Sequence, residues 1–138
     1  MKRLGRHLIV EYTGCDRTIL DDIGQMEQHM TEAVRRSGAT IVKSVFHRYN
    51  PQGVSGVVVI AESHMSIHTW PEYCYAAVDF FTCGDAVDPY LAHDHLYNML
   101  RCTGSDINEI KRGIPSTTDE VIDHKPVTGL LLSPVRVG

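Results

Sequence analysis

The amino-acid sequence predicts an α+β fold, a two-layer α/β sandwich in which two helices cover one face of a mostly antiparallel sheet. Two observations lead to this fold class. Apolar residues recur at helical spacing in two segments, and four strand-like segments lie between those two segments in the chain. The predicted order is therefore β-α-β-β-β-β-α-β, and 138 residues amount to one ordinary domain.

The first strand and the first helix are delimited by turn and capping residues. Residues 4–12 are rich in apolar side chains and predict a strand, which Gly14 ends. Asp16 is a favourable N-cap for one continuous helix that starts near Arg17, and Gly38 can take the left-handed conformation that closes it. The apolar stripe of this helix consists of Ile19, Leu20, Ile23, Met26, Met30, Ala33 and Val34.

After this helix the apolar residues change to the two-residue period of strands. Residues 41–49 predict a strand, the Asn-Pro-Gln-Gly sequence at 50–53 predicts a turn, and residues 54–61 predict a second strand. The Val and Ile run in this second strand predicts burial on both of its faces. Residues 65–70 alternate weakly, and residues 75–82 predict a further strand.

The last part of the chain contains a helix, a strand and a tail. Asp88–Pro89 is an N-cap followed by proline at the first helical position, and the helix is expected to end before Gly104. With a last strand at 105–112, residues 1–112 form a single domain and residues 113–138 a variable C-terminal tail. Because the helices cover only one face of the sheet, we expect the other face to pair in a homodimer.

Composition and charge argue against several classes of protein. Thirteen Lys and Arg residues against seventeen Asp and Glu residues give a net charge of −4, which disfavours nucleic acid or an anionic membrane as a partner. The longest interior apolar run, residues 57–61, is too short to span a bilayer, and the N-terminal segment lacks the apolar stretch of a signal peptide. Four widely spaced cysteines without a CxxC pair are expected to be reduced thiols, so we expect a cytoplasmic protein.

The densest group of polar residues directly follows the apolar strand at 54–61. Polar side chains in such a place are costly to bury unless they are paired or used. Four of them are of types that bind metals, namely His64, His68, Cys74 and Cys83. Their spacing matches no familiar zinc pattern, so no metal site is predicted. Residues 53–56 (Gly-Val-Ser-Gly) are not a GxSxG motif, which disfavours a serine hydrolase, and without a glycine-rich phosphate loop nucleotide hydrolysis has no support.

Seven short motifs occur together at fixed spacing. They are Gly5-Arg6-His7-Leu8, Ser37-Gly38-Ala39-Thr40-Ile41, Phe46-His47-Arg48, Pro51-Gln52-Gly53-Val54-Ser55-Gly56, Glu62-Ser63-His64, Ile67-His68-Thr69-Trp70-Pro71-Glu72 and Phe81-Thr82-Cys83-Gly84. In this combination the chain resembles the short prokaryotic form of the S-adenosylmethionine decarboxylase proenzymes, a pyruvoyl-dependent family. The resemblance covers roughly residues 1–100, and residues 53–72 are its most specific part.

The resemblance implies that the chain cuts itself between Glu62 and Ser63. The serine hydroxyl attacks the preceding carbonyl, and β-elimination then leads to a covalent pyruvoyl group, which is the expected cofactor. His68 is implied as the base that removes the serine α-proton, and Ser55 as the group that stabilises the oxyanion. The expected products are a β chain of residues 1–62 and an α chain of residues 63–138.

The implied substrate is S-adenosylmethionine, held as a Schiff base on the pyruvoyl ketone while carbon dioxide leaves. The product is the aminopropyl donor for spermidine biosynthesis. Cys83 is implied as the proton donor to the α-carbon of the substrate. Trp70 and Tyr49 are the candidate aromatic faces for the sulfonium and the adenine, and Glu72 is the candidate partner of the ribose hydroxyls.

Two other functions remain open at this point. Related pyruvoyl proteins on the same scaffold decarboxylate arginine or ornithine with the same self-processing residues, so the motifs specify the cofactor more firmly than the substrate. A non-catalytic, uncleaved regulatory homologue is the other alternative. The sequence also departs from the family pattern near the expected site: Cys74 stands where glycine is frequent, and Phe80 and Phe81 are bulkier than usual.

Overall fold

The computed structural model describes residues 3–114. Its strands are β1 (Gly5–Thr13), β2 (Thr40–Arg48), β3 (Val54–Ala61), β4 (Ser63–Trp70), β5 (Tyr75–Cys83) and β6 (Gly104–Arg112). Its helices are α1 (Arg17–Leu20), α2 (Ile23–Ser37), the 3-10 turn η1 (Pro71–Tyr73) and α3 (Pro89–Met99). Among these described helices, none combines the length and the apolar character needed to cross a bilayer. The expected tail lies, apart from its first two residues, outside the described residues.

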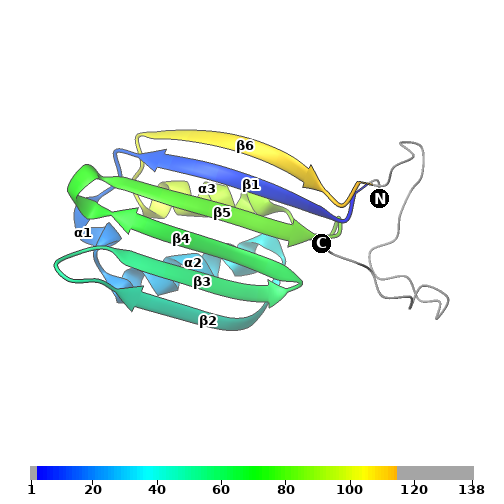
Figure 1. Cartoon of the computed structure of the whole chain (residues 1–138), viewed down its shortest axis with the longest axis horizontal. Helices are drawn as coiled ribbons and strands as arrows, with labels where there is room; N and C mark the ends of the chain where they lie inside the picture. The colour runs from blue at the N-terminus through cyan, green and yellow to red at the C-terminus, as the bar shows by residue number, and fades with distance from the viewer. Residues whose placement is uncertain (1–2, 115–138) are drawn as a thin grey trace.

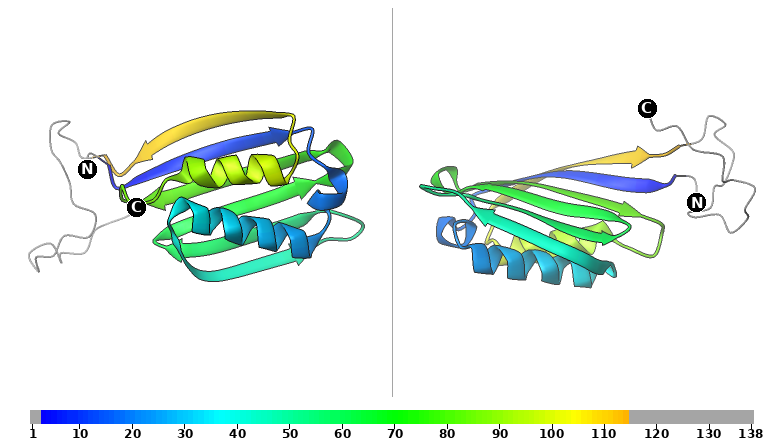
Figure 2. Two further views of the ribbon diagram at one scale, coloured as in Figure 1. Left: turned by 180° about the vertical axis from the view of Figure 1, so that it is seen from behind. Right: turned by 60° about the horizontal axis from the view of Figure 1, so that its bottom comes forward.

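The six strands form one sheet in the order β2-β3-β4-β5-β1-β6, and each of the five pairings is antiparallel. Helices α2 and α3 lie against the same face of this sheet (Figures 1 and 2). The predicted two-layer sandwich is therefore confirmed. Because β1 lies between β5 and β6, the beginning and the end of the described chain are joined in the same part of the sheet.

The core fills the space between the sheet and the helices. Every second residue of the central strands points into this layer, as the burial pattern of β5 illustrates. The largest fully buried side chains include Leu8, Tyr12, Met26, Met30, Met65, Ile67, Phe80 and Leu96. Burial of one side chain of this size contributes about 1.5–3 kcal/mol relative to exposure, so this layer fixes which face each strand presents to the helices.

The expected single N-terminal helix is wrong, because the structure has two helices separated by Asp21 and Asp22. The Asp22 side chain accepts a hydrogen bond from the Gln25 backbone N–H and so caps the start of α2. The Asp21 side chain accepts from the Arg48 guanidinium at 2.8 Å and from the Gly53 backbone N–H at 2.9 Å. Asp21 therefore anchors the β2–β3 turn instead of continuing the helix. The other predicted caps, Gly38 and Asp88, are confirmed.

The predicted burial of residues 54–61 on both faces is also wrong for the single chain. One face of β3 packs against the helices, but on the other face Val59 is 39% exposed. Val45 on β2 and Ile9 on β1 are similarly exposed, at 53% and 40%. Figure 1 looks onto this open face of the sheet, with the helices behind it. The open face thus carries apolar side chains that no element of the described chain covers.

Gly56 on β3 provides a test of the core. A Cβ atom at this position would overlap the ring of Phe46, which lies across Gly56 from the neighbouring strand. We expect Gly56→Ala to lower the free energy of unfolding by about 1–3 kcal/mol, since the ring must move within a packed layer. Gly24→Ala in α2 is the control, because its Cβ would meet nothing closer than 3.4 Å. Equal urea midpoints for Gly56→Ala and the unsubstituted chain would contradict this account.

Candidate active site

The expected cleavage point lies at the apex of the tightest turn in the described sheet. Glu62 alone separates β3 from β4, and Ile60 already pairs with Ser63. Ser63 has a φ of 144°, in a region that L-residues rarely adopt, which costs on the order of 1–3 kcal/mol. The half-buried serine hydroxyl therefore adjoins a strained backbone segment, and this favours chemistry at the Glu62–Ser63 bond.

Cys83 is the last residue of β5 and lies at the same end of the sheet as Ser63. The register that pairs His64 with Phe81 places Ser63 opposite the last residues of β5. Burial raises the pKa of the Cys83 thiol, and the nearby Glu62 carboxylate raises it further. The thiol therefore keeps its proton at neutral pH, which is the state that a proton donor needs.

Ser55 and His68 meet at the other end of the same two strands. They face each other across β3 and β4, and Ser55 Oγ shares a 2.7 Å hydrogen bond with His68 Nδ1. Both residues line a cleft of about 340 Å³. The other residues around this cleft are Tyr49, Gln52, Gly53, Thr69, Trp70 and Glu72. All three predicted substrate-binding residues thus border the Ser55–His68 pair.

The strand register separates these two groups. Ser55 lies opposite His68, whereas Ile60 lies opposite Ser63, so the two pairs are five residue steps apart along the strands. At about 3.4 Å per residue the separation is roughly 17 Å. In Figure 1 the β3–β4 turn lies at the right end of the sheet and the β2–β3 turn at the left end. One end therefore holds Glu62, Ser63 and Cys83, and the other holds Ser55, His68, Tyr49, Trp70 and Glu72.

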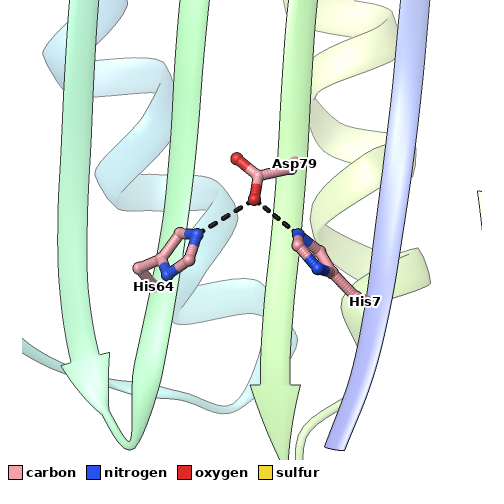
Figure 3. A group of neighbouring side chains, drawn as sticks. All are labelled: His7, His64 and Asp79. Carbon is pink, nitrogen blue, oxygen red and sulfur yellow. Dashed lines mark hydrogen bonds and ion pairs between the residues drawn. The ribbon is translucent and has the colours of Figure 1, made fainter. Parts of the chain in front are cut away.

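A third polar group, which the sequence analysis missed, lies on the open face between these two ends. Asp79 Oδ2 accepts hydrogen bonds from His7 Nε2 at 2.6 Å and from His64 Nε2 at 2.9 Å (Figure 3). Ser66 also donates to this carboxylate. Burial opposes ionisation of Asp79, but the hydrogen bonds from Ser66, His7 and His64 hold its pKa below the usual value. In the sequence, the signal that could have pointed to this group is that Asp79 is the single charged residue in the strand 75–83.

The ligand atoms of His7, His64 and Asp79 lie within 4.8 Å of one another, which is close enough for a shared metal ion. However, Arg112 Nη1 lies 3.4 Å from His7 Nδ1 and can only donate a hydrogen bond. With this contact, the imidazole proton of His7 is assigned to Nε2, the atom that faces Asp79. This favours a hydrogen-bonded triad over a metal site, and the triad ties His64, the neighbour of Ser63, to two other strands.

Comparison with known proteins bears on the meaning of this arrangement. The family model described as S-adenosylmethionine decarboxylase matches residues 6–113, which is most of the chain. The chain belongs to the S-adenosylmethionine decarboxylase family. The residues predicted to take part in self-cleavage and the residues around the cleft all fall within the matched part.

Individual relatives agree with this family. The S-adenosylmethionine decarboxylase proenzyme of Thermotoga maritima is 57% identical over 113 residues, which cover 82% of this chain and 87% of that protein. The proenzyme of a Thermoanaerobacter species is 48% identical over 124 residues, which cover 90% of this chain and all of that protein. The crystal structure of the adenosylmethionine decarboxylase from Aquifex aeolicus superimposes with a TM-score of 0.79 at 34% identity, over 89% of this chain and all of that one.

The departure from the family pattern at Cys74 has a visible backbone context. Cys74 follows η1 and has a φ of 51°, in the left-handed region that glycine adopts without cost. The frequent glycine in the family thus matches the conformation found here. The bulky Phe81 stacks on the His7 ring, with 5.0 Å between the ring centroids, and so packs against the Asp79 triad.

We expect Asp79→Asn to lower the free energy of unfolding by about 1–3 kcal/mol, because two imidazole N–H groups then compete for one neutral carbonyl oxygen. Urea unfolding measures the change. Asp85→Asn is the matched control, since the Asp85 side chain is 62% exposed and loss of its 3.5 Å ion pair with Arg3 has little effect. Similar losses in both variants would show that the triad adds no particular stability.

Proposed function

We propose that this family member is a proenzyme that cuts itself at Glu62–Ser63 and then decarboxylates S-adenosylmethionine with a pyruvoyl group made from Ser63. The decarboxylated product is the aminopropyl donor for spermidine biosynthesis. The observation that carries the proposal is the strained serine at the apex of the β3–β4 turn, with the protonated Cys83 thiol at the same end of the sheet. Because the relatives are named for S-adenosylmethionine, arginine and ornithine decarboxylation are not favoured.

The processing reaction uses side chains of the chain itself. Ser63 Oγ attacks the Glu62 carbonyl carbon, the Glu62–Ser63 amide bond breaks, and an ester forms with the same oxygen. A Ser55 hydroxyl donates to the oxyanion of this step. A His68 imidazole removes the α-proton of Ser63, and the Cβ–Oγ bond breaks to release residues 1–62 with a carboxylate at Glu62. Water then hydrolyses the remaining dehydroalanine, and its nitrogen leaves as ammonia.

The residues around position 63 fit a pyruvoyl group. Such a group supplies a carbonyl that accepts electrons as carbon dioxide leaves the substrate. Cys83 then transfers its thiol proton to the substrate α-carbon, a role supported by the raised pKa of this thiol. The triad of His7, Asp79 and His64 holds the residue next to the new end of the chain in place.

The cleft at the other end of the sheet fits the substrate. Its volume of about 340 Å³ lies in the range of small-molecule sites. Trp70 is 41% exposed and Tyr49 is 47% exposed, so aromatic faces are available for the sulfonium cation and for stacking of adenine. The Glu72 carboxylate supplies acceptors for the two ribose hydroxyls.

The two ends must work together although one chain holds them roughly 17 Å apart along its strands. We infer that two copies pair through their open faces with their strands reversed by a two-fold axis. Each Ser63 and Cys83 then meets Ser55, His68 and the cleft of the other copy. The exposed Val45, Val59 and Ile9 side chains support this pairing, because a second copy covers them.

Intact-mass analysis of freshly purified protein tests the proposed processing. We expect two chains, one ending at Glu62 and one beginning with a pyruvoyl group in place of Ser63. Ser63→Ala should give one full-length chain, because alanine has no nucleophile, whereas Ser44→Ala on β2 should be cut normally. Efficient cutting of the Ser63→Ala chain would exclude Ser63 as the nucleophile. An uncut protein that still decarboxylates S-adenosylmethionine would contradict the proposal.

Cys83→Ala tests the proton donor separately. The variant should still cut itself but should turn over S-adenosylmethionine about 10²–10⁴-fold more slowly. Because the thiol pKa lies above its ordinary value of 9.0, turnover of the unsubstituted enzyme should persist to pH 9.0 and fall only at higher pH as the thiol ionises. Cys102→Ser is the control for loss of a thiol elsewhere. Unchanged turnover by Cys83→Ala would exclude this residue as the donor.

A further inference from the structure

Two cysteines outside the proposed site lie in direct contact. Cys15 follows β1 just before α1, and Cys102 lies between α3 and β6. Their Sγ atoms are 3.3 Å apart. Cys15 is 3% exposed, whereas Cys102 is half-buried. None of the proposed catalytic steps uses either thiol, and the chain positions are 87 residues apart.

The backbone on both sides holds the two thiols together. The Asp16 N–H donates to the Leu100 carbonyl at 2.9 Å, and the Thr103 N–H donates to the Thr13 carbonyl at 3.0 Å. These bonds flank the pair and keep the two segments side by side. Since a disulfide has an S–S bond of about 2.0 Å, the sulfur atoms need to approach by little more than 1 Å, which is within reach of side-chain rotation.

The two thiols differ in acidity in a way that suits oxidation. The hydrogen bond from Cys102 lowers the pKa of Cys15, because it stabilises the Cys15 thiolate. The same hydrogen bond, together with burial, raises the pKa of Cys102. A thiol of lowered pKa beside a thiol that keeps its proton is the arrangement in which an oxidised cysteine is resolved by its neighbour.

We propose that Cys15 and Cys102 form a disulfide and that this bond joins the two chains of the mature enzyme. The second part rests on the proposed self-cleavage, which leaves Cys15 on residues 1–62 and Cys102 on residues 63–138. Hydrogen peroxide is the oxidant. The Cys15 thiolate attacks one peroxide oxygen, the O–O bond breaks with loss of hydroxide, and a sulfenic acid forms. Cys102 sulfur then displaces the sulfenic hydroxyl, which leaves with the Cys102 proton as water.

The bond has a physical consequence for the cut protein. After cleavage β1 belongs to one chain, but both of its neighbours, β5 and β6, belong to the other. Without a covalent link, the chains separate whenever the sheet unfolds, and refolding becomes bimolecular. A disulfide between them keeps β1 near its partners and limits the freedom of the unfolded state.

Denaturing electrophoresis tests the link. The cut protein is treated with hydrogen peroxide, remaining thiols are alkylated, and samples are run with and without dithiothreitol. We expect one band near the full-length position without dithiothreitol and two shorter bands with it. Cys102→Ser should give two bands in both lanes, whereas Cys74→Ser should behave like the unsubstituted protein. Two bands for the oxidised, unreduced protein would overturn the proposal.

The Ser63→Ala chain separates this proposal from the proposed cleavage. Peroxide should make this uncut chain lighter by two hydrogen atoms, and peptide mapping should recover a Cys15–Cys102 cross-linked pair. A single band that survives dithiothreitol in the unsubstituted protein would mean that cleavage has failed, and the peptide map then still decides the disulfide. Recovery of Cys15 and Cys102 as separate alkylated or sulfinic peptides would overturn it in either background.

Discussion

The antiparallel register between β3 and β4 determines how far apart the two groups of site residues lie. This register places Ser63 at one end of the two strands and the Ser55–His68 pair at the other. The strands belong to the interior of a continuous six-stranded sheet, so the separation cannot close without loss of backbone hydrogen bonds. A hydroxyl and an imidazole can act on Ser63 only from hydrogen-bond distance. The proposed processing reaction therefore requires a second source of these groups.

In the proposed dimer, pairing through the open face of the sheet supplies these groups from the second copy. Its apolar side chains are exposed in the single chain, while the opposite face of the same strands is packed against α2 and α3. The triad of His7, Asp79 and His64 lies on this face between the two groups of site residues. Its polar atoms bond to one another, which lowers the cost of covering them. The same surface can thus be an interface and carry the reaction.

Local patterns in the sequence were sufficient for most of the fold. The caps at Gly38 and Asp88 and the turn at 50–53 depend on residues close in the chain, and they were predicted correctly. The break between α1 and α2 was not, because Asp21 leaves the helix to bind Arg48 and Gly53, which are distant in sequence. The burial of β3 was overestimated for a similar reason, since an apolar run does not say whether its second face is covered within one chain.

The site residues were proposed from a motif, and the motif carries no distances. It brought Ser55, His68 and Ser63 together as one constellation, whereas the strand register divides them into two. The Asp79 triad was missed because its members come from β1, β4 and β5, and only the assembled sheet brings them into contact. Pairwise contacts of this kind lie beyond the reach of composition and spacing.

Co-expression of two differently tagged variants tests whether His68 of one copy acts on Ser63 of the other. Ser63→Ala lacks the nucleophile and His68→Ala lacks the base, so each variant alone should remain uncut. In a mixed dimer the intact Ser63 of the His68→Ala copy faces the intact His68 of the Ser63→Ala copy. With random pairing, about half of the His68→Ala chains should then be cut, and none of the Ser63→Ala chains. If both variants stay uncut when co-expressed in mixed dimers, His68 does not act across the interface and the account is contradicted.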